Sequence, residues 1–232
     1  MAPHSIAAAV ARAQEAIAAA CARRGRRTEA VRLLAATKTV AVEQIRAAHA
    51  AGVRLFGENR VQERLAKQAD LADLDAEWHL LGPLQSNKAA KALPAFDVIE
   101  TVASPELALR LSRLAVAPVN IMLEINIGHE AQKHGLAPEA AEELLGAVSA
   151  APHLRLIGCM AVPPVTTDPE RSRPHFAALA ALSDRLRAVL PAPPQRWELS
   201  MGMSADYEVA VEEGATLVRL GTALFGERPV HG

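Results

Sequence analysis

Short apolar stretches rich in β-branched residues recur along the chain, separated by longer segments whose apolar residues lie three and four positions apart. Several short stretches are apolar at almost every position, as expected for parallel strands, which are buried on both faces of their sheet. We therefore predict eight strands, at residues 31–37, 53–56, 78–81, 96–101, 119–126, 154–161, 197–200 and 216–220.

The longer segments have the apolar spacing of amphipathic helices, and Asp, Ser or Pro stands near their starts. An opening helix is predicted before the first strand. The predicted helices are residues 5–24, 42–51, 59–75, 105–115, 138–151 and 169–190. Strands that alternate with helices in this way indicate βα units.

Eight βα units predict an α/β fold of the closed (β/α)8 type, the TIM barrel, with the opening helix as an addition. The chain of 232 residues lies within the size range of this fold, so residues 1–232 are expected to form one domain. An open, doubly wound sheet is the alternative. It is disfavoured because no G-x-G-x-x-G fingerprint follows the first strand and no Walker loop is present.

Composition and charge exclude several classes of protein. Half of the residues are hydrophobic and the net charge is −1, which indicates a globular chain without the basic excess of a nucleic-acid binder. Cys21 and Cys159 lie far apart, and no ligand spacing joins cysteines or histidines, so we expect inert thiols, a reducing compartment and no metal. Arg12 and Glu15 interrupt the Ala-rich start, so we expect no signal peptide or membrane span and a cytoplasmic protein.

Lys38 is the first candidate for chemistry. It directly follows the first predicted strand and is one of five lysines in a chain with twenty arginines. Active groups of a (β/α)8 barrel lie at the carboxyl ends of its strands. A lysine amine desolvated in a barrel mouth suits Schiff-base chemistry, with a solvated or salt-bridged lysine as the alternative.

Small residues follow the last two predicted strands, namely Ser200, Gly202, Gly221 and Thr222. Loops after strands seven and eight of this fold recurrently bind phosphate, because backbone N–H and hydroxyl groups can surround the anion. We therefore predict a phosphate site there. The alternative is that the glycines only make tight turns.

Arg219 lies two residues before Gly221 and, by strand alternation, on the same face. A guanidinium only donates hydrogen bonds, so at the barrel mouth it could hold an unprotonated heterocyclic nitrogen. The alternative is an Arg219 that pairs with a core carboxylate such as Glu124 or Glu198.

Six segments complete the sequence pattern. They are AATKTV around Lys38, FGENRVQE from Phe56, WHLLGPLQSNK from Trp78, KHG at 133–135, GCMAVPP from Gly158 and LSMGMSADYEVAVEEGATLVRLGTALFG from Leu199. Together they resemble the pyridoxal phosphate homeostasis proteins over essentially the whole chain. This resemblance implies the barrel of alanine racemase, a fold-type III architecture for binding pyridoxal 5′-phosphate (PLP).

The resemblance also implies roles for individual residues. It implies a PLP aldimine on Lys38, the phosphate near Ser200, Gly221 and Thr222, and the pyridine nitrogen against Arg219. Other candidates follow the second and third strands and are expected to face the mouth, although capping or turn roles would explain Asn59 equally well. They are Asn59, His79, Gln85, Asn87 and Lys88.

Lys133 resembles a family lysine on the loop after the fifth strand and is a candidate second lysine near the cofactor. His129 and His134 are expected at the surface, and Cys159 in the core. A basic run follows the first helix, and we interpret it as a solvated helix end. It consists of Arg23, Arg24, Arg26 and Arg27.

The expected function is that of a carrier, which holds PLP, maintains PLP homeostasis and delivers the cofactor to apo PLP-dependent enzymes, without robust catalysis. The alternatives are a weak PLP-dependent amino-acid racemase and a Schiff-base aldolase without PLP. A racemase needs a second base, which related racemases take from a C-terminal domain, whereas this chain ends eleven residues after Gly221 and its one tyrosine is Tyr207. Arg219 would also weaken the electron sink of the pyridine ring. Without the additional domain we expect a monomer.

Overall fold

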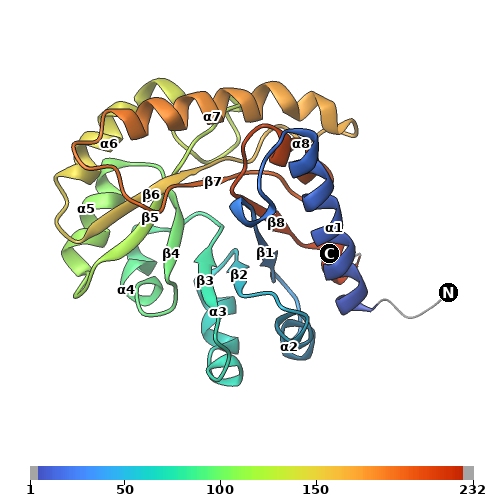
Figure 1. Cartoon of the computed structure of the whole chain (residues 1–232). Helices are drawn as coiled ribbons and strands as arrows, with labels where there is room; N and C mark the ends of the chain where they lie inside the picture. Colours follow the sequence, from blue (N-terminus) through green and yellow to red (C-terminus); the bar gives the residue numbers. More distant parts are fainter. Residues whose placement is uncertain (1–4, 227–232) are drawn as a thin grey trace.

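Eight parallel strands close into a barrel in the computed structural model, which describes residues 5–226 (Figure 1). Each strand pairs with the next one along the chain, and β8 pairs with β1. The strands are β1 (Arg32–Ala36), β2 (Leu55–Glu58), β3 (Glu77–Leu80), β4 (Val98–Val102), β5 (Val119–Glu124), β6 (Leu154–Met160), β7 (Glu198–Ser200) and β8 (Leu217–Leu220). The predicted (β/α)8 barrel is confirmed.

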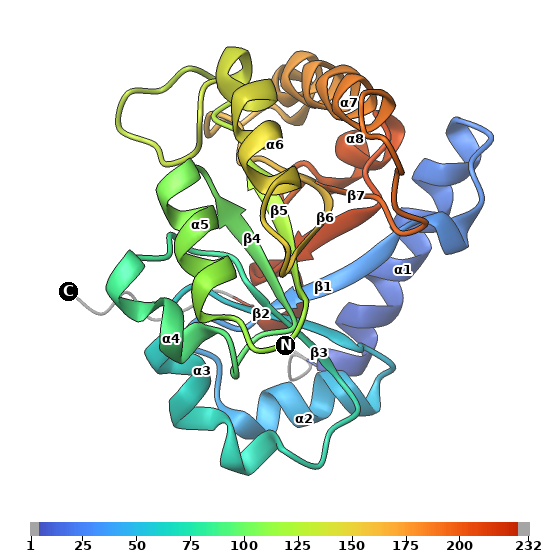
Figure 2. The same cartoon turned by 90° about the vertical axis from the view of Figure 1, so that its left-hand side faces the viewer.

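Helices lie outside the strands on all sides of the barrel (Figures 1 and 2). They are α1 (Ile6–Arg23), α2 (Val42–Ala50), α3 (Val61–Lys67), α4 (Ala89–Ala92), α5 (Pro105–Leu114), α6 (Ala141–Ser149), α7 (Arg173–Ala188), α8 (Tyr207–Glu212) and α9 (Thr222–Phe225). The additional helix α1 packs against α2, α8 and α9. Within residues 5–226, no helix combines the length and the apolar character needed to cross a membrane.

Strand β2 differs most from its prediction, because it begins at Leu55 and continues through Gly57 to Glu58. Glycine and glutamate are poor strand formers, but here Gly57 and Glu58 pair with His79 and Leu80 of β3. A Cβ atom on Gly57 would overlap side-chain atoms of the neighbouring strands and their loops. The glycine therefore serves close packing inside the barrel wall, and Asn59 lies in a loop instead of starting a helix.

Three predicted helices are divided in the structure. Residues 59–75 form α3 and a separate 3-10 turn at Ala69–Leu71. The other two predicted helices begin with 3-10 turns, Pro138–Ala140 and Pro169–Ser172, before α6 and α7. Proline suits the first helical position, and 3-10 turns are common at helix starts. Helices α4, α8 and α9 have only four to six residues, too few for a helical period in the sequence.

Two apolar layers flank the barrel wall. Alternate strand residues point to opposite faces, so Leu34 belongs to a small cluster inside the barrel while Ala35 packs toward the helices. The inner cluster consists of Leu34, Leu55, Val98, Met122, Ile157, Met160 and Leu217. Other interior positions carry polar and charged side chains, which are described with the site below.

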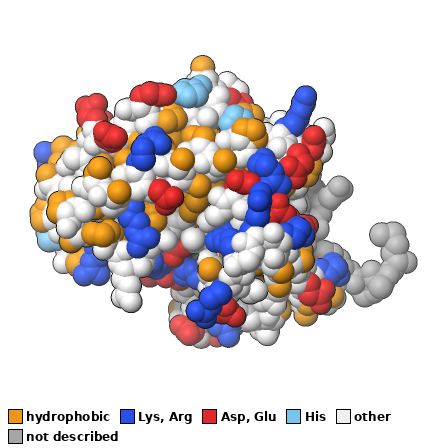
Figure 3. Space-filling view, turned by 45° about the horizontal axis from the view of Figure 1, so that its top comes forward, with side chains coloured by type: hydrophobic (Ala, Val, Ile, Leu, Met, Phe, Trp, Pro, Cys, Tyr) orange, Lys and Arg blue, Asp and Glu red, His pale blue; other side chains and the backbone are white. Residues whose placement is uncertain are grey.

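The basic run after α1 is exposed at Arg23, Arg24 and Arg27, as expected for a solvated helix end, but it also makes specific contacts with α8. Arg23 pairs with Glu208 and Glu212 of α8, and Arg26 donates to backbone carbonyls at the end of the same helix. Acidic and basic side chains accordingly lie side by side where α1 meets α8 (Figure 3). The run attaches α1 to the C-terminal part of the barrel wall.

Candidate functional site

A cavity of about 390 Å³ opens at the carboxyl ends of the strands. Of the residues predicted from the sequence, Lys38, Asn59, Arg219, Gly221 and Thr222 line it. The remaining lining residues are Ala36, Leu81, Val162, Met203, Ser204 and Ala205. The structure therefore brings together residues at or just beyond the ends of β1, β2, β3, β6, β7 and β8, which lie up to 186 positions apart in the chain.

Lys38 lies in a tight turn directly after β1. The backbone N–H of Thr37 extends the pairing with β2 by donating to Gly57, and the N–H of Val40 donates back to the carbonyl of Thr37 at 2.9 Å. Thr39 has a φ of 59°, which is unusual for a β-branched residue. This turn leaves the Lys38 side chain exposed at the rim of the cavity.

The loops after β7 and β8 meet through Ser204. Its hydroxyl oxygen accepts hydrogen bonds from the backbone N–H groups of Gly221 at 3.3 Å and Ala223 at 3.1 Å. Thr222 begins α9 and is exposed beside them. Sequence reasoning missed Ser204, although it lies two residues beyond Gly202 in the glycine-marked exit of β7.

Ser200 does not lie at this cavity. Its side chain is fully buried inside the barrel, where the hydroxyl donates to Glu100 at 2.6 Å and accepts from Arg219 at 2.5 Å. Strand β7 ends at Ser200, so the loop that reaches the cavity begins only beyond it. The expectation that Ser200 lies at the barrel mouth is corrected, because the serine that lines the cavity is Ser204.

Arg219 lines the cavity from inside the barrel and is only 5% exposed. Its guanidinium donates to Ser200 and, at 2.8 Å, to the carbonyl of Ala161, and it lies 4.0 Å from Glu100. The sequence had suggested Glu124 or Glu198 as carboxylate partners, but Glu100 takes that place. Burial lowers the pKa of Arg219, while Glu100 opposes this shift. These contacts fix the guanidinium in one orientation.

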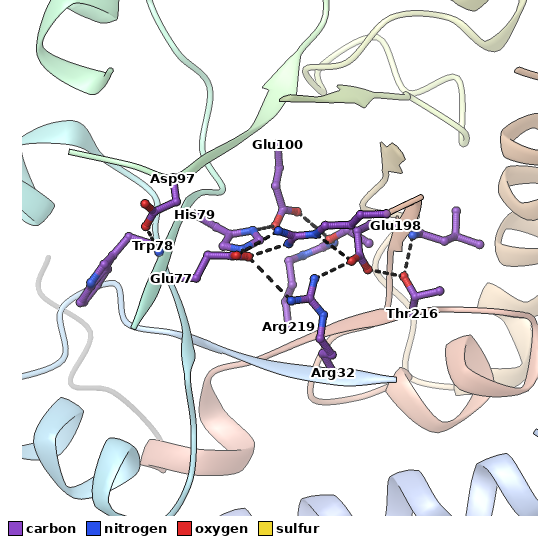
Figure 4. A network of polar contacts seen from close by, with 12 residues as sticks. Arg32, Glu77, Trp78, His79, Asp97, Glu100, Glu198, Thr216 and Arg219 are labelled. Carbon is purple, nitrogen blue, oxygen red and sulfur yellow. Dashed lines mark hydrogen bonds and ion pairs between the residues drawn. The ribbon is translucent and has the colours of Figure 1, made fainter. Parts of the chain in front are cut away.

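His79 also lies inside the barrel and not at its mouth, so that expectation is corrected. It is fully buried, with Nδ1 2.6 Å from Glu100 and Nε2 2.7 Å from Glu77 (Figure 4). Burial lowers the pKa of His79, but hydrogen bonds to the two carboxylates outweigh it and raise the pKa above its usual value. The two carboxylates thus favour the protonated form of the imidazole.

The polar chain continues below His79 toward the amino ends of the strands. Glu77 accepts two hydrogen bonds from Arg196, and Arg32 bridges to Glu198 at 2.5 Å. Figure 4 shows this continuous series of contacts across the barrel interior. Burial would raise the pKa of Glu100, but His79 and Arg219 lower it, which favours the carboxylate form of Glu100.

Glu124 at the end of β5 is a titratable group near this chain that sequence reasoning considered only as an ion-pair partner. Burial raises its pKa to about 7, although the charge of Arg219 opposes the shift. Desolvation is the dominant cause. Glu124 is not among the lining residues of the cavity.

Lys133 is held away from the cavity by its own neighbours. Its amine donates to the carbonyl of Pro163 at 2.7 Å and pairs with Glu130. It lines neither the cavity of Lys38 nor the one beside it. The expectation that Lys133 approaches the cofactor is therefore not met by this arrangement.

A second cavity of about 460 Å³ adjoins the first, and Lys38 and Asn59 line both. It gathers the cationic side chains of Arg60 and Lys88 and the exposed His134, with no carboxylate among its lining residues. Gln85 lines it as well, whereas Asn87 lines neither cavity. Positive charge thus collects on the solvent side of Lys38.

Metal-binding clusters and reactive thiols are two further kinds of site to consider among the described residues. Within residues 5–226 no group of three or more His, Cys, Asp or Glu side chains is arranged to hold a metal ion. Both cysteines are buried, as expected, and burial raises the pKa of Cys159 to about 12. This thiol has no nucleophilic character near neutral pH.

Comparisons with known proteins agree with this geometry. Residues 7–229 match the family described as "Alanine racemase, N-terminal domain". Two proteins named pyridoxal phosphate homeostasis protein are close relatives. The one from Aquifex aeolicus is 42% identical, over 94% of this chain and 96% of its own length. The one from Pseudomonas aeruginosa is 45% identical, over 97% of this chain and 94% of its own length.

Solved structures show the same fold. PipY of Synechococcus elongatus with PLP bound superposes with a TM-score of 0.78 at 40% identity, covering 90% of this chain and all of PipY. Alanine racemase of Corynebacterium glutamicum has a TM-score of 0.65 at 20% identity, over 94% of this chain and 62% of the racemase, and shares the fold alone. The chain belongs to the pyridoxal phosphate homeostasis protein family, and its barrel matches the N-terminal domain of the alanine racemases.

Proposed function

We propose that this protein binds PLP covalently through Lys38 and serves as a reservoir and carrier that maintains PLP homeostasis. The observation that carries the proposal is the cavity at which Lys38, Arg219 and the Ser204–Gly221 contact converge. The names of the relatives and the PLP bound to PipY support the identity of the ligand. When bound, PLP supplies an aldehyde that condenses with a lysine amine, with loss of water, to a Schiff base.

The residues at the cavity fit the parts of PLP. The hydroxyls of Ser204 and Thr222 can donate to a phosphate, and the two N–H groups that bind the Ser204 oxygen strengthen that hydroxyl as a donor. Arg219 keeps its charge and its orientation, so it can donate only to an unprotonated pyridine nitrogen. Asn59 offers an amide beside Lys38.

The same residues favour binding over turnover. Among the described residues that line the cavity, Lys38 is the one group able to act as a base, and neither a carboxylate nor a tyrosine is present. Tyr207 lines a different hollow, near Arg23. Racemisation needs groups on both sides of the substrate carbon. We therefore propose that the protein has no robust activity on amino acids, and that it acts as a monomer that passes PLP to apoenzymes.

The covalent bond is tested by borohydride reduction of the PLP-loaded protein and peptide mass mapping. A pyridoxyl adduct on the peptide that contains Lys38 is expected, and Lys38→Ala should lose it while remaining folded, because an exposed rim residue is not part of the core. Lys91→Ala, at an exposed position on α4, is the matched control and should keep the adduct. An adduct confined to another lysine would refute the assignment.

Turnover is tested separately by solvent deuterium exchange at the Cα atom of L- and D-amino acids with saturating PLP. We expect rates far below ~1 s⁻¹, the lower edge of ordinary enzymes. Exchange at or above that rate would instead support the racemase alternative.

A further inference from the structure

The turn that carries Lys38 has an unfavourable residue at its third position. The hydrogen bond from Val40 to the carbonyl of Thr37 closes a four-residue turn with Lys38 and Thr39 in its centre. A positive φ confined to the third residue is typical of a type II turn, which normally has glycine or asparagine there. Here the residue is Thr39, with a φ of 59°, so the turn needs support from outside itself.

Lys67 gives this support from the end of α3. Its Nζ atom donates to the carbonyl oxygen of Thr37 at 3.0 Å and to Oε1 of Glu58 at 2.8 Å. The Thr37 hydroxyl lies 2.8 Å from the same Glu58 oxygen and 3.1 Å from the carbonyl oxygen of Gly57, so its one proton has two acceptors within reach. These hydrogen bonds thus connect the end of α3 (Lys67) with the end of β2 (Glu58) and with Thr37, the residue before Lys38.

The ion pair at this point is buried and incompletely satisfied. Glu58 is fully buried, and its Oε2 atom, like Oε2 of the neighbouring Glu63, has no hydrogen-bond partner among the described residues. Burial raises the pKa of Glu58, Lys67 opposes this, and Glu63 adds to the rise. Buried ion pairs often stabilise a fold no better than apolar side chains of similar size. The contact with Thr37 is therefore the distinctive contribution of Lys67.

We infer that Lys67 is a positioning residue for Lys38: it holds the Thr37 carbonyl and, with Glu58, fixes the turn that presents the Lys38 amine to the cavity. Lys67 lines neither cavity, so it acts only through the turn. The inference rests on the proposed function of Lys38, and it adds that reactivity at this amine depends on a tether from α3.

The test compares Lys67→Met with the double variant Lys67→Met/Glu58→Gln. The single variant leaves a buried carboxylate without its cation and is expected to lose stability. In the double variant a neutral amide replaces that carboxylate and can donate to Glu63, so thermal stability should largely recover while the Thr37 carbonyl remains without its tether. Lys91→Met is the matched control, because Lys91 is an exposed lysine on α4.

Two measurements report on the turn that contains Lys38. One is the hydrogen-exchange rate of the Val40 amide in the apoprotein, and the other is the rate constant for formation of the PLP absorbance band. In the double variant we expect exchange at Val40 to be at least tenfold faster and band formation at least tenfold slower than in the parent. The single variant Lys67→Arg keeps a cation near the Thr37 carbonyl and Glu58, so it should retain most of the parental rate of band formation.

A double variant with parental stability, Val40 exchange and band formation would overturn the inference. If the double variant does not fold, the comparison is made within the parent protein, between the amides of Val40 and His129, because the His129 amide closes a turn on an exposed loop. A Val40 amide that exchanges as fast as the His129 amide would overturn the inference. A Val40 amide that exchanges much more slowly would support the inference. A parent that takes up no PLP on Lys38 would refute the proposed function, while Val40 exchange would still test the tether.

Discussion

Two serines four positions apart have different surroundings. Ser200 is enclosed in the barrel between Glu100 and Arg219, whereas Ser204 lies at the cavity and binds the backbone of Gly221. Both lie in the glycine-marked exit of β7, and the sequence pattern alone selects Ser200, which does not line the cavity. Only the length of β7, which ends at Ser200, decides which hydroxyl reaches the cavity.

Removal of the Ser204 hydroxyl should weaken the binding of PLP but not of pyridoxal, which has no phosphate. A hydrogen bond to a charged group contributes about 1.5–3 kcal/mol, so Ser204→Ala is expected to raise the Kd for PLP by roughly 10- to 100-fold. Absorbance titrations with both aldehydes measure the effect. Equal losses for PLP and pyridoxal would show that Ser204 does not contact the phosphate.

His79 gives the folded protein a pH dependence with a definite sign. Its pKa is raised in the folded state, so between the unfolded value of about 6.5 and the folded value only the folded state holds the proton. The free energy of unfolding should therefore fall as the pH rises through this interval, with a slope of up to ~1.4 kcal/mol per pH unit.

Urea unfolding at a series of pH values from about 6 upward measures this slope. His79→Gln should reduce both the slope and the stability at neutral pH, because the buried Glu100 and the half-buried Glu77 lose their shared partner. His153→Gln, at an exposed position, is the control and should keep the parental slope. An unchanged slope in His79→Gln would show that His79 is neutral in the folded state.

At the scale of elements, the approach of β6 to β7 depends on one glycine. Gly158 has a φ of 145°, and a Cβ atom there would overlap the backbone carbonyl of Glu198, its partner in β7. Gly158→Ala should therefore lower the free energy of unfolding by more than about 3 kcal/mol, as expected for strain with a backbone clash. Chemical denaturation measures the loss.

Gly146 provides the matched comparison. It lies within α6, and a Cβ atom there meets nothing within 4 Å, so Gly146→Ala should raise stability by roughly 0.5–1 kcal/mol. Similar changes in both variants would contradict the packing described for β6 and β7.

The elements were largely predictable from the sequence because strands buried on both faces produce continuous apolar runs. The predicted runs at 119–126 and 154–161 exceed β5 and β6 by only one or two residues at their carboxyl ends. Gly57 and Glu58 were not recognised as strand because their propensities oppose it, and parallel pairing with β3 overrides them. Short helices such as α9 were not predicted because four residues are too few to show a helical period of apolar positions.

Side-chain direction was harder to predict than position. Lys38 stands out in the sequence because lysine is rare in this chain, and it does lie at the cavity. His79 and Ser200 also lie near strand ends, but they point into the barrel, where Glu100 bonds to both. Contacts between strands distant in the sequence determine such directions, and no local pattern contains them.

At the scale of the whole molecule, a nearly neutral protein collects positive charge beside Lys38. The second cavity presents Arg60 and Lys88 to solvent without a carboxylate among its lining residues. Cationic clefts raise the association rate of anions, and salt screens this effect. PLP carries a phosphate, so its association rate should fall as ionic strength increases.

Stopped-flow absorbance at low and physiological ionic strength tests this expectation. Arg60→Gln/Lys88→Gln should associate more slowly at low salt and show a weaker salt dependence than the parent. Arg185→Gln/Arg187→Gln, on α7, keeps the same net charge as that variant and should behave like the parent. An equal loss in both variants would assign the effect to net charge and not to the cavity.

The contact of Ser204 with Gly221 and Ala223 also matters when the cavity holds no ligand. A binding loop built from bare N–H groups leaves unsatisfied donors when its anion departs, and such loops tend to rearrange. Here the serine oxygen accepts hydrogen bonds from two of those donors, at Gly221 and Ala223. The loop is therefore expected to keep its conformation when an anion leaves, so a carrier of the proposed kind would not need to rebuild its binding loop in each cycle of uptake and release.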